Sequence, residues 1–159
     1  MIQRIQSVYL FISIVLIVVS GFVGNIFNVI TNSNNTTYGY QANEVYVIGT
    51  KTLISSEPQY LWFYPIVIAL VGLYALFSFK DLKKQLKLAR IYWGAVIATL
   101  LIHVGMKYYT QFQVEEGQLI QASAGASFYL TVIAMPFAHL AFMNILKDKR
   151  TIASIDRIR

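Results

Sequence analysis

Four long apolar segments dominate this chain of 159 residues and leave few folds open to it. A bilayer core of about 30 Å requires roughly 20 apolar residues in helical form, and each segment comes close to that length. None of the segments alternates apolar and polar residues as a half-buried strand does. We therefore predict an all-α membrane protein with one domain, a four-transmembrane-helix bundle whose spans cover about residues 7–30, 61–79, 91–109 and 127–146.

The composition supports a membrane location and limits the chemistry. Hydrophobic residues make up 57% of the chain and charged residues only 13%, whereas soluble domains contain about 45–50% and about 25%. The absence of cysteine excludes disulfides, thiolate nucleophiles and thiolate-bound zinc or iron–sulfur clusters. The chain also lacks a phosphate-binding glycine loop and the HExxH and GxSxG motifs. These patterns predict no cofactor and no metal site, and they identify no catalytic residue.

Basic residues are distributed unevenly about the four predicted spans. Eleven of the thirteen lie on one side of them, namely Arg4, Lys80, Lys83, Lys84, Lys87, Arg90, Lys147, Lys149, Arg150, Arg157 and Arg159. Cytoplasmic segments of membrane proteins are enriched in Lys and Arg, so we expect both termini in the cytoplasm and the loops 31–60 and 110–126 outside. Because each basic group adjoins the end of a span, we interpret these charges as setting orientation and contacting anionic lipid headgroups. We expect no nucleic acid as a partner.

The first apolar segment has an alternative interpretation as a cleaved signal peptide, because the small residues Ser20 and Gly21 follow an apolar run. However, apolar residues continue as far as Val29, and Arg4 is the one basic side chain before the run. We therefore predict a retained transmembrane helix.

Two connecting segments are predicted to lie outside the membrane. The first contains EVYVIGTKTLIS, in which β-prone runs at 45–48 and 52–54 flank Gly49 and predict a small β-hairpin in the first outer loop. The second contains the adjacent carboxylates Glu115 and Glu116. We interpret this pair as a solvated acidic patch, with a cation site or an acid/base pair as the alternative.

The residues after the fourth span form a basic tail, 147–159, with the sequence KDKRTIASIDRIR. Its isoleucines are three residues apart, so a helical tail would be amphipathic. Two interpretations stay open, a short helix lying on the inner leaflet or a segment that docks onto a cytoplasmic or membrane partner. The inner link KDLKKQLKLAR is likewise predicted to extend the second or third span as a helix along the headgroups.

Three ionisable side chains fall within or at the edge of the predicted spans. His103 and Lys107 are four residues apart on the third span and share a helix face, and His139 lies on the fourth span. At 1.5 Å per residue the two histidines differ in level by roughly 9 Å, which does not suit a shared metal ion. We expect the imidazoles to form hydrogen bonds between helices, with a proton relay between them as the alternative. Lys107 is expected to extend to the outer surface.

Small residues four apart mark one face on each of the last two spans. Gly94 and Ala98 lie on the third span, and Ala134 and Ala138 on the fourth. Such spacing lets transmembrane helices approach closely, so it predicts helix packing at both faces. Pro136 is expected to kink the fourth span or to rely on a neighbouring helix to satisfy the carbonyls that it frees.

The two ends of the chain carry a more specific signal. The opening MIQRIQSVYL and the closing SIDRIR, with four spans between them, resemble the bacterial family called domain of unknown function 4293. The resemblance in architecture covers the whole chain, and its specific part is confined to residues 1–10 and 154–159. It implies a source in the Bacteroidota and a location in the inner membrane. It implies no activity, so it adds no catalytic residue.

The most distinctive polar residues therefore lie at the cytoplasmic ends, and the sequence of the spans shows no recognisable polar constellation. The first hypothesis is a non-enzymatic accessory or structural subunit of a larger bacterial inner-membrane complex, acting in protein translocation or envelope biogenesis. It predicts that other inner-membrane subunits bind at Arg4, Asp156, Arg157 and Arg159.

Two alternatives stay open. The first is a small-molecule or lipid binder or carrier with an outward-facing site near His103, for which His103, Lys107 and His139 are the candidate ligand-binding residues. The second is a membrane enzyme that uses His103 or His139 as its acid or base. General acid/base catalysis requires a second polar group within hydrogen-bond reach of the catalytic one.

Overall fold

The computed structural model describes residues 3–23, 26–31, 37–40, 45–47, 53–55, 63–113 and 119–156. Its four helices are α1 (Gln3–Phe22), α2 (Tyr64–Phe77), α3 (Leu82–Gln113) and α4 (Ala126–Asp156). Its five strands are β1 (Phe27–Thr31), β2 (Thr37–Tyr40), β3 (Val45–Val47), β4 (Leu53–Ser55) and β5 (Leu119–Ala124).

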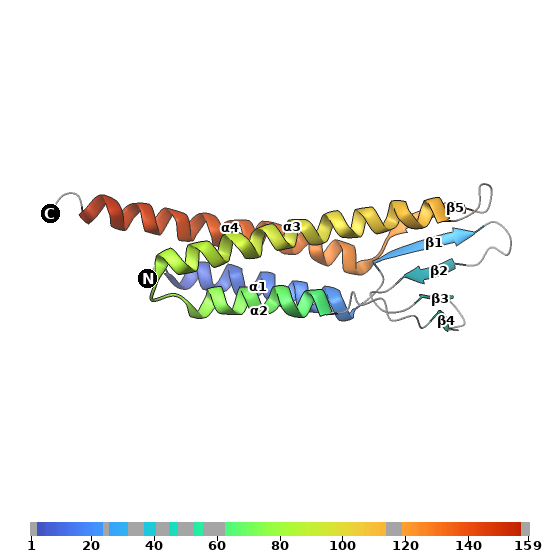
Figure 1. Cartoon of the computed structure of the whole chain (residues 1–159), viewed down its shortest axis with the longest axis horizontal. Coiled ribbons are helices and arrows are strands. Elements are labelled where there is room, and N and C mark those ends of the chain that lie inside the picture. The colour runs from blue at the N-terminus through green and yellow to red at the C-terminus, as the bar shows by residue number, and fades with distance from the viewer. Residues whose placement is uncertain are drawn as a thin grey trace.

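The molecule is elongated and has two different ends (Figure 1). The helices run along the long axis, and the strands gather at one end, the sheet end. The start of α1, the turn between α2 and α3 and the end of α4 lie at the opposite end. Because the basic residues concentrate in these segments of the sequence, we call it the basic end.

Three helices are long and apolar enough to cross a membrane, through the segments Ile5–Phe22, Leu82–Gly105 and Ala126–Ser154. Helix α2 is shorter than the predicted second span, since it has 14 residues. At 1.5 Å per residue it extends about 21 Å, against a bilayer core of about 30 Å. The described residues therefore support a membrane protein with three full-length spans and a shorter apolar helix packed beside them.

The first span ends earlier than predicted. Helix α1 stops at Phe22, and the apolar residues from Phe27 form strand β1 instead of continuing a helix to residue 30. A short apolar run fits a strand as well as a buried helix, and Gly21 lowers helix propensity close to the boundary. The strand forms here because β1 is hydrogen-bonded to β2 on one side and to β5 on the other.

The other two spans extend further than predicted at the basic end. The inner link joins α3, as predicted, and Asp81 caps this helix by accepting hydrogen bonds from the backbone N–H groups of Lys83 and Lys84 at 3.0 and 3.1 Å. Residues 147–156 continue α4 without a break. As far as residue 156, the tail is thus a continuation of α4 and not a separate short helix.

The strands form a single antiparallel sheet in the order β4-β3-β2-β1-β5. The two β-prone runs of the first outer loop correspond to β3 and β4, which pair with Val45 opposite Ser55. Strands β1, β2 and β5 were not predicted. Strand β5 pairs with β1 in a register that places Ala124 opposite Phe27. The sheet therefore joins the end of α1 to the start of α4.

The helices pack in a ring, in which α1 and α3 each contact both α2 and α4. The buried core combines aliphatic side chains with alanines that allow close approach, including Ala69, Ala75 and Ala141. At Gly72 of α2 the backbones come so close that an added Cβ would lie 2.7 Å from Ile14 Cγ1 and 2.8 Å from Tyr92 Cε2.

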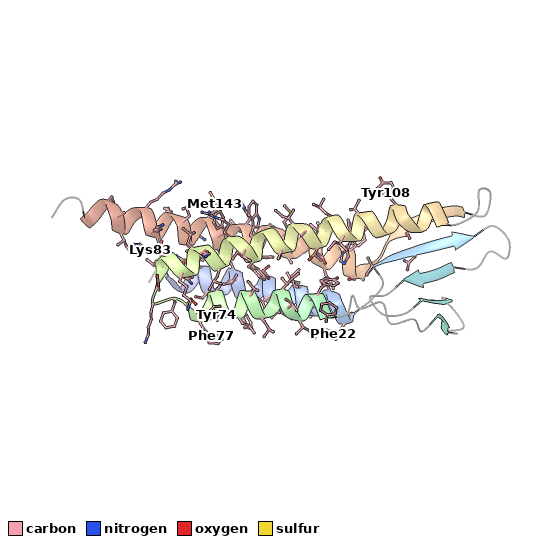
Figure 2. All side chains as sticks on the ribbon, viewed as in Figure 1. Phe22, Tyr74, Phe77, Lys83, Tyr108 and Met143 are labelled. Carbon is pink, nitrogen blue, oxygen red and sulfur yellow. The ribbon has the colours of Figure 1, made fainter. Side chains whose placement is uncertain are left out.

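Large apolar side chains cover the outside of the helices. Leu70, Phe77 and Leu101 are 59%, 69% and 67% exposed, and Figure 2 shows Phe22, Phe77 and Met143 pointing away from the bundle. A soluble domain rarely exposes so much contiguous apolar surface. The outside of the bundle thus suits contact with lipid, in agreement with the three spans.

Candidate functional site

Side chains of α1 and α4 join the two termini at the basic end. Gln6 is only 2% exposed. Its amide Nε2 donates to the Asp148 carboxylate and also lies 3.4 Å from the Asn144 carbonyl oxygen. One glutamine of the MIQRIQ segment is therefore fixed inside the bundle and binds an acidic residue of the fourth helix.

A second polar cluster lies in the middle of the bundle. The Tyr92 hydroxyl donates to Ser13 Oγ at 2.9 Å, and Ser13 Oγ donates to the Ala134 carbonyl at 2.9 Å. All three residues are completely buried. The chain of two hydrogen bonds crosses from α3 through α1 to α4, two residues before Pro136. These two bonds meet at Ser13 and hold the facing sides of α1, α3 and α4 in one orientation.

A third cluster, close to the sheet end, joins the end of α1 to the start of α4. The hydroxyl of Ser127 donates to the carbonyl of Ser20. Thr131 and Ser20 donate to carbonyls of their own helices, at Ser127 and Ile17. These hydroxyls therefore satisfy backbone acceptors, which explains how polar residues are tolerated inside an apolar bundle.

His103 forms a pair with Tyr64, the first residue of α2. The imidazole is 2% exposed, and its Nε2 lies 2.7 Å from the Tyr64 hydroxyl oxygen, with the rings edge to face. The other ring nitrogen, Nδ1, is buried and has no hydrogen-bond partner among the described residues. The pair links the start of α2 to α3, and it places a second polar group within hydrogen-bond reach of this histidine.

His139 lies in a different environment, on the exposed face between α3 and α4. Its ring is 5.4 Å from that of Trp93, which stacks on Phe142 with an angle of 3° between the ring planes. The guanidinium of Arg90 lies over the ring of Phe142, 5.9 Å from its centroid. His139 thus belongs to an aromatic row that ends in a cation.

The two histidines are not brought together. His139 contacts Trp93, and His103 follows Trp93 by ten residues on the same helix, which corresponds to about 15 Å. This separation is larger than the spacing expected from the sequence, and it gives no direct proton path between the rings.

The comparison with protein families accounts for the whole architecture. Residues 2–158 match the model of the family described as "Domain of unknown function (DUF4293)". The chain belongs to this family. The DUF4293 match spans the helices, the sheet and both ends of the chain, so the resemblance noted at the two ends is confirmed and extends between them. No curated protein matches the chain.

The proposed partner-binding residues of this DUF4293 chain are placed in part. Arg4 lies near the start of α1 and Asp156 is the last residue of α4, so their backbones belong to the same end of the molecule. Their side chains, the side chain of Lys107, and all of Arg157, Arg159, Glu115 and Glu116 lie outside the described residues.

Sequence reasoning missed the partners that give the buried polar residues their roles. Ser13 and Tyr64 lie in apolar segments and belong to no motif. Gln6 belongs to the opening MIQRIQSVYL, but the sequence contains no sign that its partner is Asp148. Each pair joins residues far apart in the chain, between 39 and 142 positions, so no local pattern contains both members.

Proposed function

We propose that this chain is a non-enzymatic accessory subunit of a larger complex in the bacterial inner membrane. The observation that carries the proposal is the extension of α4. Ile145 is completely buried, whereas every described side chain from Arg150 to Ser154 is exposed. In Figure 1 this part of α4 projects past the turn between α2 and α3. A helix that continues beyond its own bundle, with Ile152 exposed among basic residues, is suited to packing against another subunit.

The charge distribution supports an orientation with both termini in the cytoplasm. Lys147, Lys149 and Arg150 lie on the projecting helix, and the basic link begins α3 at the same end. Lys and Arg are concentrated on the cytoplasmic side of membrane proteins. The partner-binding residues Arg4, Asp156, Arg157 and Arg159 would then face cytoplasmic parts of the complex.

The buried polar groups favour a structural role over a catalytic one. In the described part of the chain, no three His, Asp or Glu side chains gather in one place. Ser13, Ser20, Tyr92 and Ser127 bind carbonyls or one another, as expected of bonds that hold helices together. His103 and Tyr64 meet the geometric minimum for acid/base chemistry, but both nitrogens of the ring are enclosed by the bundle. We assign this pair to holding α2 against α3.

The process is proposed to be protein translocation or envelope biogenesis. A small subunit with a rigid bundle, a sheet at one end and an extended helix at the other can contact components on both sides of a membrane. Partners of this complex would bind at the projecting helix first, since it is the most exposed helical segment at the basic end among the described residues.

The test is removal of residues 151–159 from a chain tagged inside its first loop. The truncation leaves Ile145 and the bond between Gln6 and Asp148 in place, so the bundle should fold and insert. We expect stoichiometric partners to co-purify with the full chain in mild detergent and to be lost from the truncated one, as measured by mass spectrometry.

A matched control separates loss of the helix from loss of charge. Lys80→Gln with Lys83→Gln removes exposed basic residues from the same end but leaves α4 intact. This variant should retain its partners. Equal recovery of partners by the truncated and full-length chains, or purification of the full chain as a clean monomer, would contradict the proposal.

A further inference from the structure

One face of the bundle combines an apolar surface with a cation, Arg90, toward the basic end. It is the seam between α3 and α4, formed on α3 by Arg90, Trp93, Ile97 and Leu100, and on α4 by Phe142, His139, Met135 and Val132. The two sets recur every three or four residues, so each occupies one stripe of its helix. Contacts of Phe142 with Arg90, and of His139 with Trp93, fix the antiparallel register. This register places Ile97 level with Met135, and Leu100 level with Val132.

Arg90, the charged group of the seam, lies close to the level at which the first apolar membrane-crossing segment begins. Phe142, which carries the Arg90 guanidinium, is within one turn of Asn144, whose carbonyl is 3.4 Å from Gln6. Arg90 is therefore level with the first turns of α1, where the first membrane-crossing segment begins at Ile5. His139 lies one turn deeper than Phe142. Toward the sheet end, the seam contains no charged side chain from Trp93 to Leu100 or from Val132 to Met135.

Both Arg90 and His139 are exposed, and neither belongs to the three buried polar clusters. A guanidinium is charged at any physiological pH and can bind a phosphate through two parallel hydrogen bonds. The face of Phe142 holds this guanidinium at a defined place, since a cation over an aromatic ring is attracted by the ring. Phe142 stacks on Trp93, and the two rings contact Arg90 and His139 respectively.

We propose that the seam between α3 and α4 is a binding site for one anionic phospholipid. Arg90 binds its headgroup phosphate, His139 donates one turn deeper to the ester oxygens of the glycerol backbone, and one acyl chain lies along Ile97, Leu100, Met135 and Val132. The occupant is a lipid and not a soluble phosphate, because Arg90 lies at the end of a partly exposed apolar stripe. The occupant is anionic because the Arg90 guanidinium is permanently charged and no acidic side chain lies on the seam. This site is independent of the projecting helix, so it does not depend on the proposed subunit role.

The test uses native mass spectrometry of the full chain in detergent, titrated with phosphatidylglycerol or with phosphatidylcholine that has the same acyl chains. The first variant is Arg90→Gln. Its control is Lys84→Gln, because Lys84 is also an exposed cation held over an aromatic ring, 4.5 Å from the Tyr74 centroid, but on the side of α2. The two variants remove equal charge from the same helix.

We expect wild type to retain one phosphatidylglycerol more tightly than phosphatidylcholine. Arg90→Gln should weaken phosphatidylglycerol binding about tenfold, as for loss of a charge-assisted hydrogen bond. Lys84→Gln should change it less than about twofold, as for a surface charge. His139→Phe keeps a ring against Trp93 and removes its polar atoms, and should weaken binding about threefold, as for a neutral hydrogen bond.

Equal losses from Arg90→Gln and Lys84→Gln would overturn the site, since binding would then follow net charge alone. Equal retention of the two lipids by wild type would show that the headgroup charge is not recognised. Displacement of the lipid by excess inorganic phosphate would show that the acyl chain contributes nothing. The replaced residues are exposed, and unchanged thermal unfolding would confirm that each variant keeps its fold.

Discussion

The last two spans carry the same spacing of small residues but use it differently. On α4, Ala134 and Ala138 are 0% and 1% exposed and lie in the core. On α3, Gly94 and Ala98 are exposed, and a Cβ added at Gly94 would have no atom within 4 Å outside its own helix neighbourhood. The predicted packing is thus confirmed for α4, whereas the face of α3 touches no other described helix at Gly94.

The difference shows that small residues four apart identify one face of a helix, but they do not predict whether another helix packs against that face. At Ala134 the close approach of α1 brings the Ser13 hydroxyl within 2.9 Å of the alanine carbonyl. Such a bond requires a small side chain at the contact, because a larger one would separate the backbones. At Gly94 the same spacing adjoins the lipid-facing surface, and no such bond accompanies it in the described structure.

The comparison is tested most strongly by enlarging one alanine on each face. Ala138→Leu inserts three carbon atoms into a filled core and should lower the free energy of unfolding by about 1–3 kcal/mol, or prevent folding. Ala98→Leu adds the same atoms to an exposed face and should change it by less than about 0.5 kcal/mol. Thermal unfolding in detergent measures both. Similar losses would show that the two faces are equally covered.

Two glycines sharpen the same contrast with a smaller change. Gly72→Ala places a methyl group against Ile14 and Tyr92, which are themselves buried, and should destabilise the bundle by about 1–2 kcal/mol. Gly94→Ala meets open space and gains helix propensity, so it should be neutral or stabilising by up to about 1 kcal/mol. Denaturation curves of the two variants should shift in different directions. A stabilising Gly72→Ala would contradict the close approach of α1, α2 and α3.

The hydrogen bonds that accompany the buried face should contribute no more than the close packing does. Tyr92→Phe removes one hydrogen bond but leaves Ser13 bound to Ala134, and should cost about 0.6 kcal/mol. Ser13→Ala leaves the buried Tyr92 hydroxyl without its acceptor and should cost more, about 1–2 kcal/mol. The order of the two unfolding temperatures is the critical result. A larger loss in Tyr92→Phe would show that Ser13 is not the centre of this cluster.

The sequence predicted the helical parts of the fold because their signal is strong and local. Apolar runs and basic flanks located α3 and α4, and their additional turns follow from good helix formers such as the lysines and leucines of the inner link. The failures lie where apolar residues leave the helix. FNVIT of β1 and LIQASA of β5 become strands because they pair with each other across the chain, and neither has a period that distinguishes strand from helix.

The candidate site was less predictable than the fold. His103 and His139 stand out in any sequence of this composition, but their partners Tyr64 and Trp93 are among many aromatic residues that anchor helices at interfaces. The seam depends on register, since Arg90 meets Phe142 only after α3 and α4 align. Residue types near one another in the sequence cannot supply that alignment.

The pairing of β1 with β5 also has a consequence for biosynthesis. Strand β1 leaves the ribosome directly after the first helix, whereas its partner β5 follows α3, and Phe27 pairs with Ala124. The sheet therefore lacks its edge strand β5 until most of the chain has been made. The first helix must likewise wait for its neighbour α4, which is synthesised last. Contacts of such long sequence separation form slowly, so the nascent protein passes through a stage in which α1, α2 and α3 are inserted while the bundle is still open along the side that α4 will fill.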